Sequence, residues 1–184
     1  MGDGCMFIYP IDEELSLKLV TEKDAEEVYQ MIDSSRDHFR EWLGWLDHST
    51  KVEDAKVNIQ ANLKRFISNE GLDTAIVYKG KIVGKIGFNT INRANQTASI
   101  GYMLHEAFQG KGIMTRAVKA MLKIAFEEYR LNKVEIHAAA GNTKSRNIPI
   151  RLGFQEEGTI RSAEWLYNHY VDHVVYGMLR EEWV

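Results

Sequence analysis

The sequence predicts a mixed α/β domain in which helices flank a central sheet. Segments with alternating apolar and polar residues, typical of half-buried strands, are interleaved with segments whose apolar residues recur at helical spacing. The chain has 184 residues, of which 45% are hydrophobic, so it is long enough to bury a full core. Because no repeat, low-complexity tract or linker interrupts it, we expect a single domain over residues 1–184.

Composition and charge narrow the classes of function. A net charge of -3 gives no reason to expect a nucleic-acid-binding protein, which usually carries a basic face. Cys5 is the only cysteine, so an internal disulfide and a thiolate metal cage are not expected. No apolar run approaches the roughly 20 residues that span a bilayer, and a secretory signal is not recognisable. We therefore expect a soluble cytoplasmic protein that does not contact a membrane.

The N-terminal part of the sequence predicts one strand followed by three helices. Thr21 is followed by Asp24 at the spacing of a capping box, in which side chains satisfy the first N–H groups of a helix. Thr50 and Glu53 repeat this spacing. The expected elements are a strand over residues 15–19, a helix from Thr21, a helix over residues 36–46 and a helix from Thr50 to about Ser68.

The remaining sequence predicts strands on either side of one long amphipathic helix. Lys79-Gly80 has the composition of a tight hairpin turn between two strands. Met114, Ala117 and Met121 begin the apolar stripe of the long helix. The expected elements are strands over residues 74–78, 82–88 and 99–104, a helix over 113–129, a strand over 134–140, a helix over 144–152, one or two strands within 154–167 and a closing strand over 170–179.

A glycine-rich run, Gln109-Gly110-Lys111-Gly112-Ile113-Met114, joins a strand to the long helix. Two glycines let the chain turn tightly and aim consecutive N–H groups at one point, and the helix adds its free first-turn donors and the positive end of its dipole. Such a loop suits a pyrophosphate, and a plain strand-to-helix turn is the alternative. It is neither a Walker A loop nor the three-glycine dinucleotide fingerprint.

The order of elements and several motifs resemble the GNAT superfamily of acetyl-coenzyme A-dependent N-acetyltransferases. The resemblance covers nearly the whole chain and is strongest to the branch that acetylates the N-termini of ribosomal proteins, in particular its bacillar members. It implies a mostly antiparallel sheet of about seven strands that is splayed between strands 4 and 5. The segments that carry it are Trp42-Leu43-Gly44-Trp45-Leu46, Ile100-Gly101-Tyr102-Met103-Leu104, the glycine-rich run, Asn142-Thr143-Lys144-Ser145-Arg146 and Leu152-Gly153-Phe154.

Two positions depart from the wider superfamily. Met114 stands where the loop usually ends in Gly or Ala. Pro149 stands where many members carry a tyrosine that protonates the leaving thiolate, so a tyrosine at this position cannot supply the acid here.

The resemblance implies how acetyl-coenzyme A is held. Pantetheine would lie along the fourth strand, bonded by backbone groups of Met103 and Leu104, and Asn142 would also bond it. No metal is implied, and the helix-like spacing of His169 and His173 falls in a turn that runs into a strand. The residues expected to hold the pyrophosphate are Gln109, Gly110, Lys111, Gly112, Ile113, Met114 and Thr115.

Glu106 and Ser145 are the expected catalytic residues. Glu106 lies just past the strand, where the resembled enzymes place their proposed base, and an ordinary surface glutamate is the alternative. Ser145 is the expected acid, its hydroxyl bonded to the coenzyme sulfur, and a helix cap is its alternative role. Trp42, Trp45 and Tyr102 are expected to line the acceptor groove, with Trp42 and Trp45 on one helical face, and core packing is the alternative.

We therefore expect an acetyl-coenzyme A-dependent N-acetyltransferase whose favoured acceptor is the N-terminal α-amine of a ribosomal protein. A small amine such as a polyamine, amino sugar or antibiotic is the alternative acceptor, and a coenzyme-binding regulatory module without turnover is the alternative class. The sequence leaves open the acceptor, the acyl group and the oligomeric state, a homodimer included.

Overall fold

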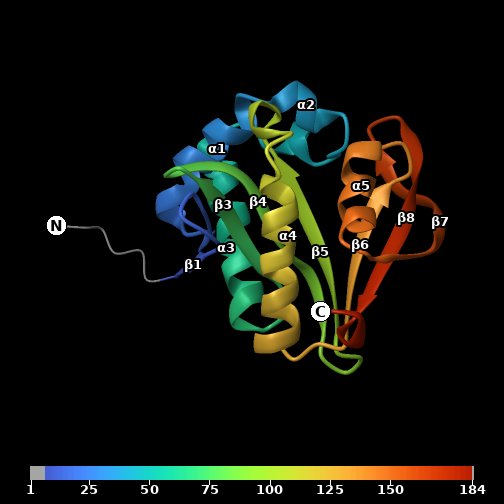
Figure 1. Ribbon diagram of the computed structural model, residues 1–184. Coiled ribbons are helices and arrows are strands. Elements are labelled where there is room, and N and C mark those ends of the chain that lie inside the picture. Colours follow the sequence, from blue (N-terminus) through green and yellow to red (C-terminus); the bar gives the residue numbers. More distant parts are fainter. Residues whose placement is uncertain (1–6, 184) are drawn as a thin grey trace.

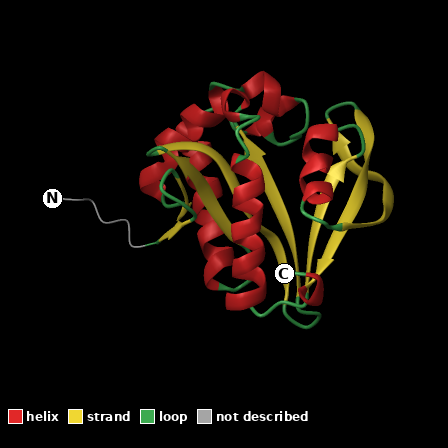
Figure 2. Cartoon of the chain, in the orientation of Figure 1, coloured by secondary structure: helices red, strands yellow, loops and turns green. Residues whose placement is uncertain are grey.

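The computed structural model describes residues 7–183, in which helices cover both faces of one eight-stranded sheet (Figures 1 and 2). The strand order is β1-β2-β3-β4-β5-β6-β8-β7, and every neighbouring pair is antiparallel except β5 and β6. The strands are β1 (Ile8–Pro10), β2 (Leu15–Leu19), β3 (Leu72–Tyr78), β4 (Lys81–Asn92), β5 (Thr97–Leu104), β6 (Lys133–Ala139), β7 (Gln155–Leu166) and β8 (His169–Leu179).

The two faces of the sheet are buried by different helices. Alternating residues of β3 show this, because Ala75 packs with α1 and α3 whereas Ile76 packs with α4. In Figure 1, α4 crosses one face of the sheet and α5 lies beside β6 and β8. The helices are α1 (Ala25–Asp33), α2 (Arg36–Arg40), α3 (Val52–Ile67), α4 (Ile113–Lys123) and α5 (Thr143–Arg151).

The sheet splits between its two parallel strands. β5 and β6 pair only from Thr97 opposite Lys133 to Ile100 opposite Ile136. Beyond that point β5 stays with β4 and β6 stays with β8, so the two strands separate (Figure 1). The expected splay is confirmed, and the divided sheet has eight strands instead of about seven because the short strand β1 joins its edge.

The helix expected over residues 36–46 is wrong after Arg40. The chain turns there, and a short 3₁₀ turn, Leu46–His48, ends the segment. Side chains of α2 hold the turns in place: the Arg36 guanidinium donates to the carbonyls of Leu46 (3.1 Å) and Ser49 (2.8 Å). A Cβ at Gly44 would lie 3.3 Å from the Trp165 carbonyl, so this glycine allows the β7–β8 hairpin to pack closely.

Two other differences concern helix ends. The carboxylate that caps α3 belongs to Asp54 rather than Glu53, since it accepts from the N–H groups of Thr50 (2.9 Å) and Lys51 (3.2 Å). The long helix widens into a π-helical segment over Ile124–Glu128, after which the buried Leu131 leads into β6. Capping by Asp24 is confirmed, because its carboxylate accepts from the N–H and the hydroxyl of Thr21.

Candidate functional site

The glycine-rich loop has the backbone conformation of an anion-binding turn. Gly110 and Gly112 have φ angles of +74° and +69°, a region that favours glycine, and Gly112 is the N-cap of α4. The first intrahelical bond runs from Arg116 N–H to the Gly112 carbonyl (3.1 Å), so the N–H groups just before it remain for a ligand. A Cβ at either glycine would meet nothing within 4 Å, so no neighbouring atoms crowd these two residues on that side.

Met114 explains one departure from the superfamily pattern. Its side chain is buried in the core on the α4 side of the sheet and is only 6% exposed. The loop therefore ends in a residue that anchors the first turn of α4, while Lys111 and Gly112 remain exposed. Met114 can contribute only its backbone to an anion, which limits the expected role of this residue.

The opening between β5 and β6 lies next to this loop. Met103 and Leu104 lie on β5 beyond the last pair with β6, so an extended ligand can approach this strand edge. Across the opening, the turn Gly141-Asn142 leads from β6 into α5. The structure thus brings the residues predicted to hold pantetheine and pyrophosphate to one place.

Asn142, not Ser145, caps α5. The Asn142 Oδ1 accepts from the Ser145 N–H at 3.0 Å, so a pantetheine contact by this side chain would use its amide nitrogen. Ser145 is the third residue of the helix and is half-buried. Its hydroxyl is therefore not needed as a cap, and the role of acid stays a prediction.

Tyr102 holds Ser145 from the opposite side of the opening. Its hydroxyl donates to the Ser145 carbonyl (2.9 Å) and accepts from the Ser145 hydroxyl (3.2 Å). The carbonyl is free for this bond because Pro149, four residues later, has no N–H. Burial raises the pKa of Tyr102 to about 12, so the phenol stays protonated at neutral pH. Tyr102 thus links β5 to α5 across the opening between β5 and β6. Its contact with an acceptor stays a prediction.

The side chain of Gln109 links three elements. Its amide nitrogen lies 2.8 Å from His38 Nε2 on α2, and its carbonyl accepts from Lys144 Nζ on α5 at 3.0 Å. The side chain is therefore engaged at both ends, and the Gln109 N–H donates to the Glu106 carbonyl at 3.1 Å, so Gln109 fixes the start of the loop.

Glu106 lies exposed to solvent directly after β5, and its role as the base stays a prediction. It is exposed and begins a short 3₁₀ turn, Glu106–Phe108, directly after β5. Its N–H donates to Ser35 Oγ at 3.3 Å, and the ring of His105 accepts from the Ala107 N–H at 3.1 Å. These bonds fix the backbone, while the Glu106 carboxylate extends from the turn.

The two expected acceptor tryptophans do not share a helical face, because both lie in turns. The Trp42 ring lies 3.4 Å from where a Cβ of Gly141 would be, at the start of the α5 turn. Trp45 is 44% exposed. Tyr167 from the β7–β8 hairpin donates to the Leu43 carbonyl (2.6 Å), so the turn and the hairpin form one wall.

The hairpin adds polar and aromatic groups that sequence reasoning missed. Glu164 Oε2 lies 3.0 Å from His173 Nε2 across β7 and β8. The rings of Trp165 and Tyr170 meet edge to face, with their centroids 4.8 Å apart. Trp165 is 54% exposed and Tyr170 62%. Trp165 and Tyr170 are direct partners in the β7–β8 register, whereas Glu164 is opposite Val171 and reaches His173 diagonally, next to a register shift between Ile160 and Glu164.

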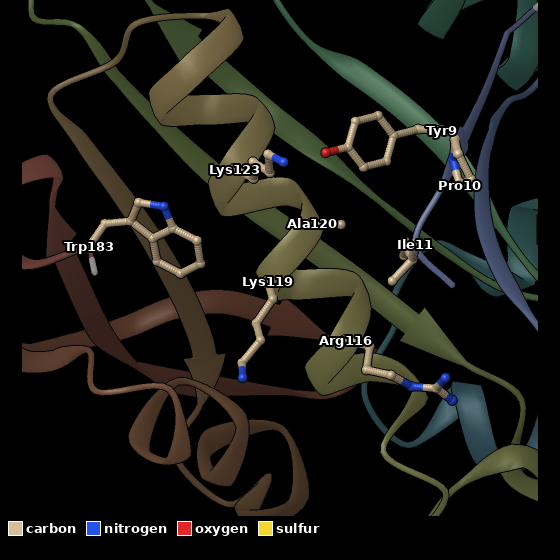
Figure 3. Close-up of a pocket in the computed structure, with 8 residues that line it drawn as sticks. All are labelled: Tyr9, Pro10, Ile11, Arg116, Lys119, Ala120, Lys123 and Trp183. Atoms are coloured by element: carbon tan, nitrogen blue, oxygen red, sulfur yellow. The ribbon is translucent and has the colours of Figure 1, made fainter. Parts of the chain in front are cut away.

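A groove of about 310 Å³ lies apart from these residues, on the outer face of α4. Figure 3 shows Lys119 and Lys123 of α4 along it, with Tyr9 and Trp183 on opposite sides. Within residues 7–183, no cluster of three or more potential metal ligands occurs, and no helix is long and apolar enough to cross a membrane.

Comparison with known proteins places this architecture in one family. The model of the acetyltransferase (GNAT) domain matches residues 14–155. YdaF of Bacillus subtilis is 33% identical over 179 residues, which cover 97% of this chain and 98% of YdaF. Solved structures of two similar proteins align with this one over most of the length of each chain.

The first of these is the microcin C7 self-immunity acetyltransferase MccE in complex with acetyl-CoA and AMP, with a TM-score of 0.89, 31% identity and coverage of 92% of this chain and 94% of that one. The second is RimL, a ribosomal L7/L12 α-N-protein acetyltransferase in complex with coenzyme A, with a TM-score of 0.91, 25% identity and coverage of 95% and 99%. The glycine-rich loop and the split between β5 and β6 fit acetyl-coenzyme A, whose thioester supplies the acetyl group. The chain belongs to the GNAT family and is an acetyltransferase that uses acetyl-coenzyme A.

Proposed function

We propose that this enzyme acetylates the N-terminal α-amine of a protein, and that a ribosomal protein is its acceptor. The observation that carries the proposal is the wall formed by the Trp42–Trp45 turn and the β7–β8 hairpin, which exposes aromatic rings. The Trp42 ring of this wall lies beside Gly141, just before α5, and we call this place the entrance. Such a wall suits an extended peptide, because aromatic side chains offer large contact areas at low entropic cost. RimL, similar over 95% of this chain, acts on the α-amine of L7/L12.

An α-amine makes a modest demand on the catalytic base. Its pKa of about 7.7–8.0 leaves roughly a tenth of it neutral at pH 7, whereas a lysine with a pKa of about 10.4 would need some 4 kcal/mol of help. One exposed carboxylate is sufficient for the first case. Glu106 has this position, so in the proposal it accepts the amine proton, directly or through water.

Ser145 completes the proton transfer. Its hydroxyl donates to Tyr102 at 3.2 Å, and a rotation of the hydroxyl hydrogen would aim it into the opening instead. In the proposal the turned hydroxyl passes its proton to the developing thiolate and regains one from solvent, while the protonated Tyr102 keeps donating to the Ser145 carbonyl and holds the residue in place. Backbone groups of Met103 and Leu104 would polarise the acetyl carbonyl, a contribution of about 3–4 kcal/mol when an oxyanion donor is well placed.

Intact-mass spectrometry of ribosomal proteins tests the proposal. Unacetylated ribosomal proteins, incubated with the enzyme and acetyl-coenzyme A, should gain the mass of one acetyl group on one protein, at its N-terminal residue. A matched incubation with Glu106→Gln controls for chemical acetylation. If no ribosomal protein gains mass while a small amine is acetylated, the acceptor assignment is wrong.

A small-molecule acceptor is the second candidate. The observation in its favour is the set of exposed rings, Trp45, Trp165 and Tyr170, since aromatic faces also stack nucleobases, and MccE was solved with AMP. Isothermal titration with AMP separates the two candidates. Saturable binding that competes with an acceptor peptide would favour a nucleotide-linked amine, whereas the protein-acceptor proposal predicts no such competition.

A further inference from the structure

Helix α5 turns two cationic side chains toward the glycine-rich loop. Lys144 and Arg151 are seven residues apart, which is two helical turns or about 10 Å along one face of the helix. Lys144 Nζ donates to Gln109 Oε1 at 3.0 Å, and Arg151 Nη1 donates to Thr115 Oγ1 at 3.2 Å. Gln109 is the first residue of the loop and Thr115 lies in the first turn of α4, so the two cations bracket the loop.

The third cation of α5 is used differently. The Arg146 guanidinium donates to the Tyr176 hydroxyl (2.9 Å) and to the Ala140 carbonyl (3.0 Å), which fastens α5 to β8 and to the turn that follows β6. Arg146 is thus a structural anchor. Lys144 and Arg151 are exposed, and the side chains to which they donate, Gln109 and Thr115, are neutral.

Other cations around the loop do not have this arrangement. Arg116 forms an ion pair with Asp12 at 2.6 Å, on the side of α4 away from α5. Lys111 lies over the Phe108 ring, 5.1 Å from its centroid. Lys144 and Arg151 are therefore the cations that reach the loop across the opening between β5 and β6.

We propose that Lys144 and Arg151 form a two-cation clamp that closes on the pyrophosphate of acetyl-coenzyme A from the α5 side. The loop N–H groups hold the phosphate oxygens from one side, and the two cations exchange their neutral partners for charged oxygens, which are stronger acceptors. Since Lys144 and Arg151 already reach the loop and α4 from α5, the pyrophosphate would take the place of these direct contacts and keep the two edges of the splay bridged. This inference rests on the coenzyme assignment of the loop.

Calorimetric titration with coenzyme A tests the clamp. Lys144→Gln and Arg151→Gln keep polar side chains but remove the charge, and each should weaken coenzyme A binding about tenfold, a typical loss for one charge-assisted hydrogen bond. Lys119→Gln is the matched control, because it removes an exposed lysine in the groove on the outer face of α4 (Figure 3). Lys144→Arg should retain most of the affinity.

Dephospho-coenzyme A locates the contact. It keeps the pyrophosphate and lacks the 3′-phosphate, so both variants should weaken its binding by the same factor as that of coenzyme A. A loss seen with coenzyme A alone would place the cations on the 3′-phosphate and overturn the proposal, as would affinities equal to that of Lys119→Gln. If the unaltered protein binds neither coenzyme form, the coenzyme assignment of the loop itself fails, which is a distinct result.

Discussion

Ser145 is held by a backbone feature that originates four residues away. Pro149 cannot donate a hydrogen bond, so the Ser145 carbonyl is left without its helical partner and accepts from Tyr102 instead. The same tyrosine then accepts from the Ser145 hydroxyl. Pro149 therefore has two effects. It stands where the superfamily usually has its tyrosine acid, and it leaves the Ser145 carbonyl free to bind Tyr102 of β5.

Capping and catalysis can be separated at α5. Asn142→Ala removes the cap and should lower the free energy of unfolding by about 1 kcal/mol. Ser145→Ala leaves the cap intact, so its melting temperature should stay near that of the unaltered protein while its single-turnover rate falls about 10²-fold, as expected for loss of a general acid. A Ser145→Ala variant with an undiminished rate would remove Ser145 from the catalytic residues.

The pKa of Tyr102 predicts a dependence of stability on alkaline pH. The phenol ionises near 10 in the unfolded chain and at about 12 in the folded protein, so between these values only the unfolded state loses the proton. The contribution of Tyr102 to the free energy of unfolding is fully present below pH 10. It declines by about 1.4 kcal/mol per pH unit up to pH 12. In urea unfolding, the difference in the free energy of unfolding between the unaltered protein and Tyr102→Phe should shrink from pH 10 to pH 12. A difference that stays constant over this range would contradict the assigned pKa.

Two carboxylates near the entrance make the base assignment testable. Glu106→Gln keeps the shape of the side chain and should reduce turnover by about 10²–10⁴-fold, with coenzyme affinity unchanged. Glu164→Gln is the comparison, since Glu164 is paired with His173 at 3.0 Å. Rates at pH 6.5, where the amine is most protonated, discriminate best. Loss of turnover in Glu164→Gln but not in Glu106→Gln would show that Glu164, and not Glu106, acts as the base.

At the scale of elements, the glycine-rich loop works through its backbone. Gly112→Ala forces an L residue to a φ of +69°, a strain of roughly 1–2 kcal/mol, and shifts the N–H groups of the loop. We expect coenzyme A affinity to fall at least about tenfold, as for loss of one or more hydrogen bonds to a charged group. Gly80→Ala imposes similar strain in the β3–β4 turn, where a Cβ also meets nothing within 4 Å. Equal affinities of the two variants would contradict the loop assignment.

How much of the site follows from the sequence depends on how local each signal is. The strand, loop and helix from β5 to α4 form from neighbouring residues, so periodicity and two glycines predict them. The turn after Arg40 does not, because it is set by contacts of Arg36 with Leu46 and Ser49 and by a hairpin more than a hundred residues later. Glu164 and His173 meet only through a shifted β register, which no local pattern encodes.

At the scale of the molecule, the split between β5 and β6 organises the site. Each half of the sheet contributes one wall: β5, the loop and α4 on one side, and β6, α5 and the β7–β8 hairpin on the other (Figure 1). Tyr102, Lys144 and Arg151 connect the walls through hydrogen bonds. An extended acceptor chain would therefore enter along a gap whose width is fixed by few contacts, with its first residue nearest Ser145.

Acetylation of two matched peptides tests the central claim, transfer to an N-terminal α-amine, most directly. One peptide has a free N-terminal serine and no lysine, and the other has the same sequence with a blocked N-terminus and one internal lysine. With the enzyme and acetyl-coenzyme A at pH 7, we predict that mass spectrometry finds one acetyl group on the first peptide and none on the second. Equal rates on both peptides, or acetylation of the lysine peptide alone, would contradict the claim.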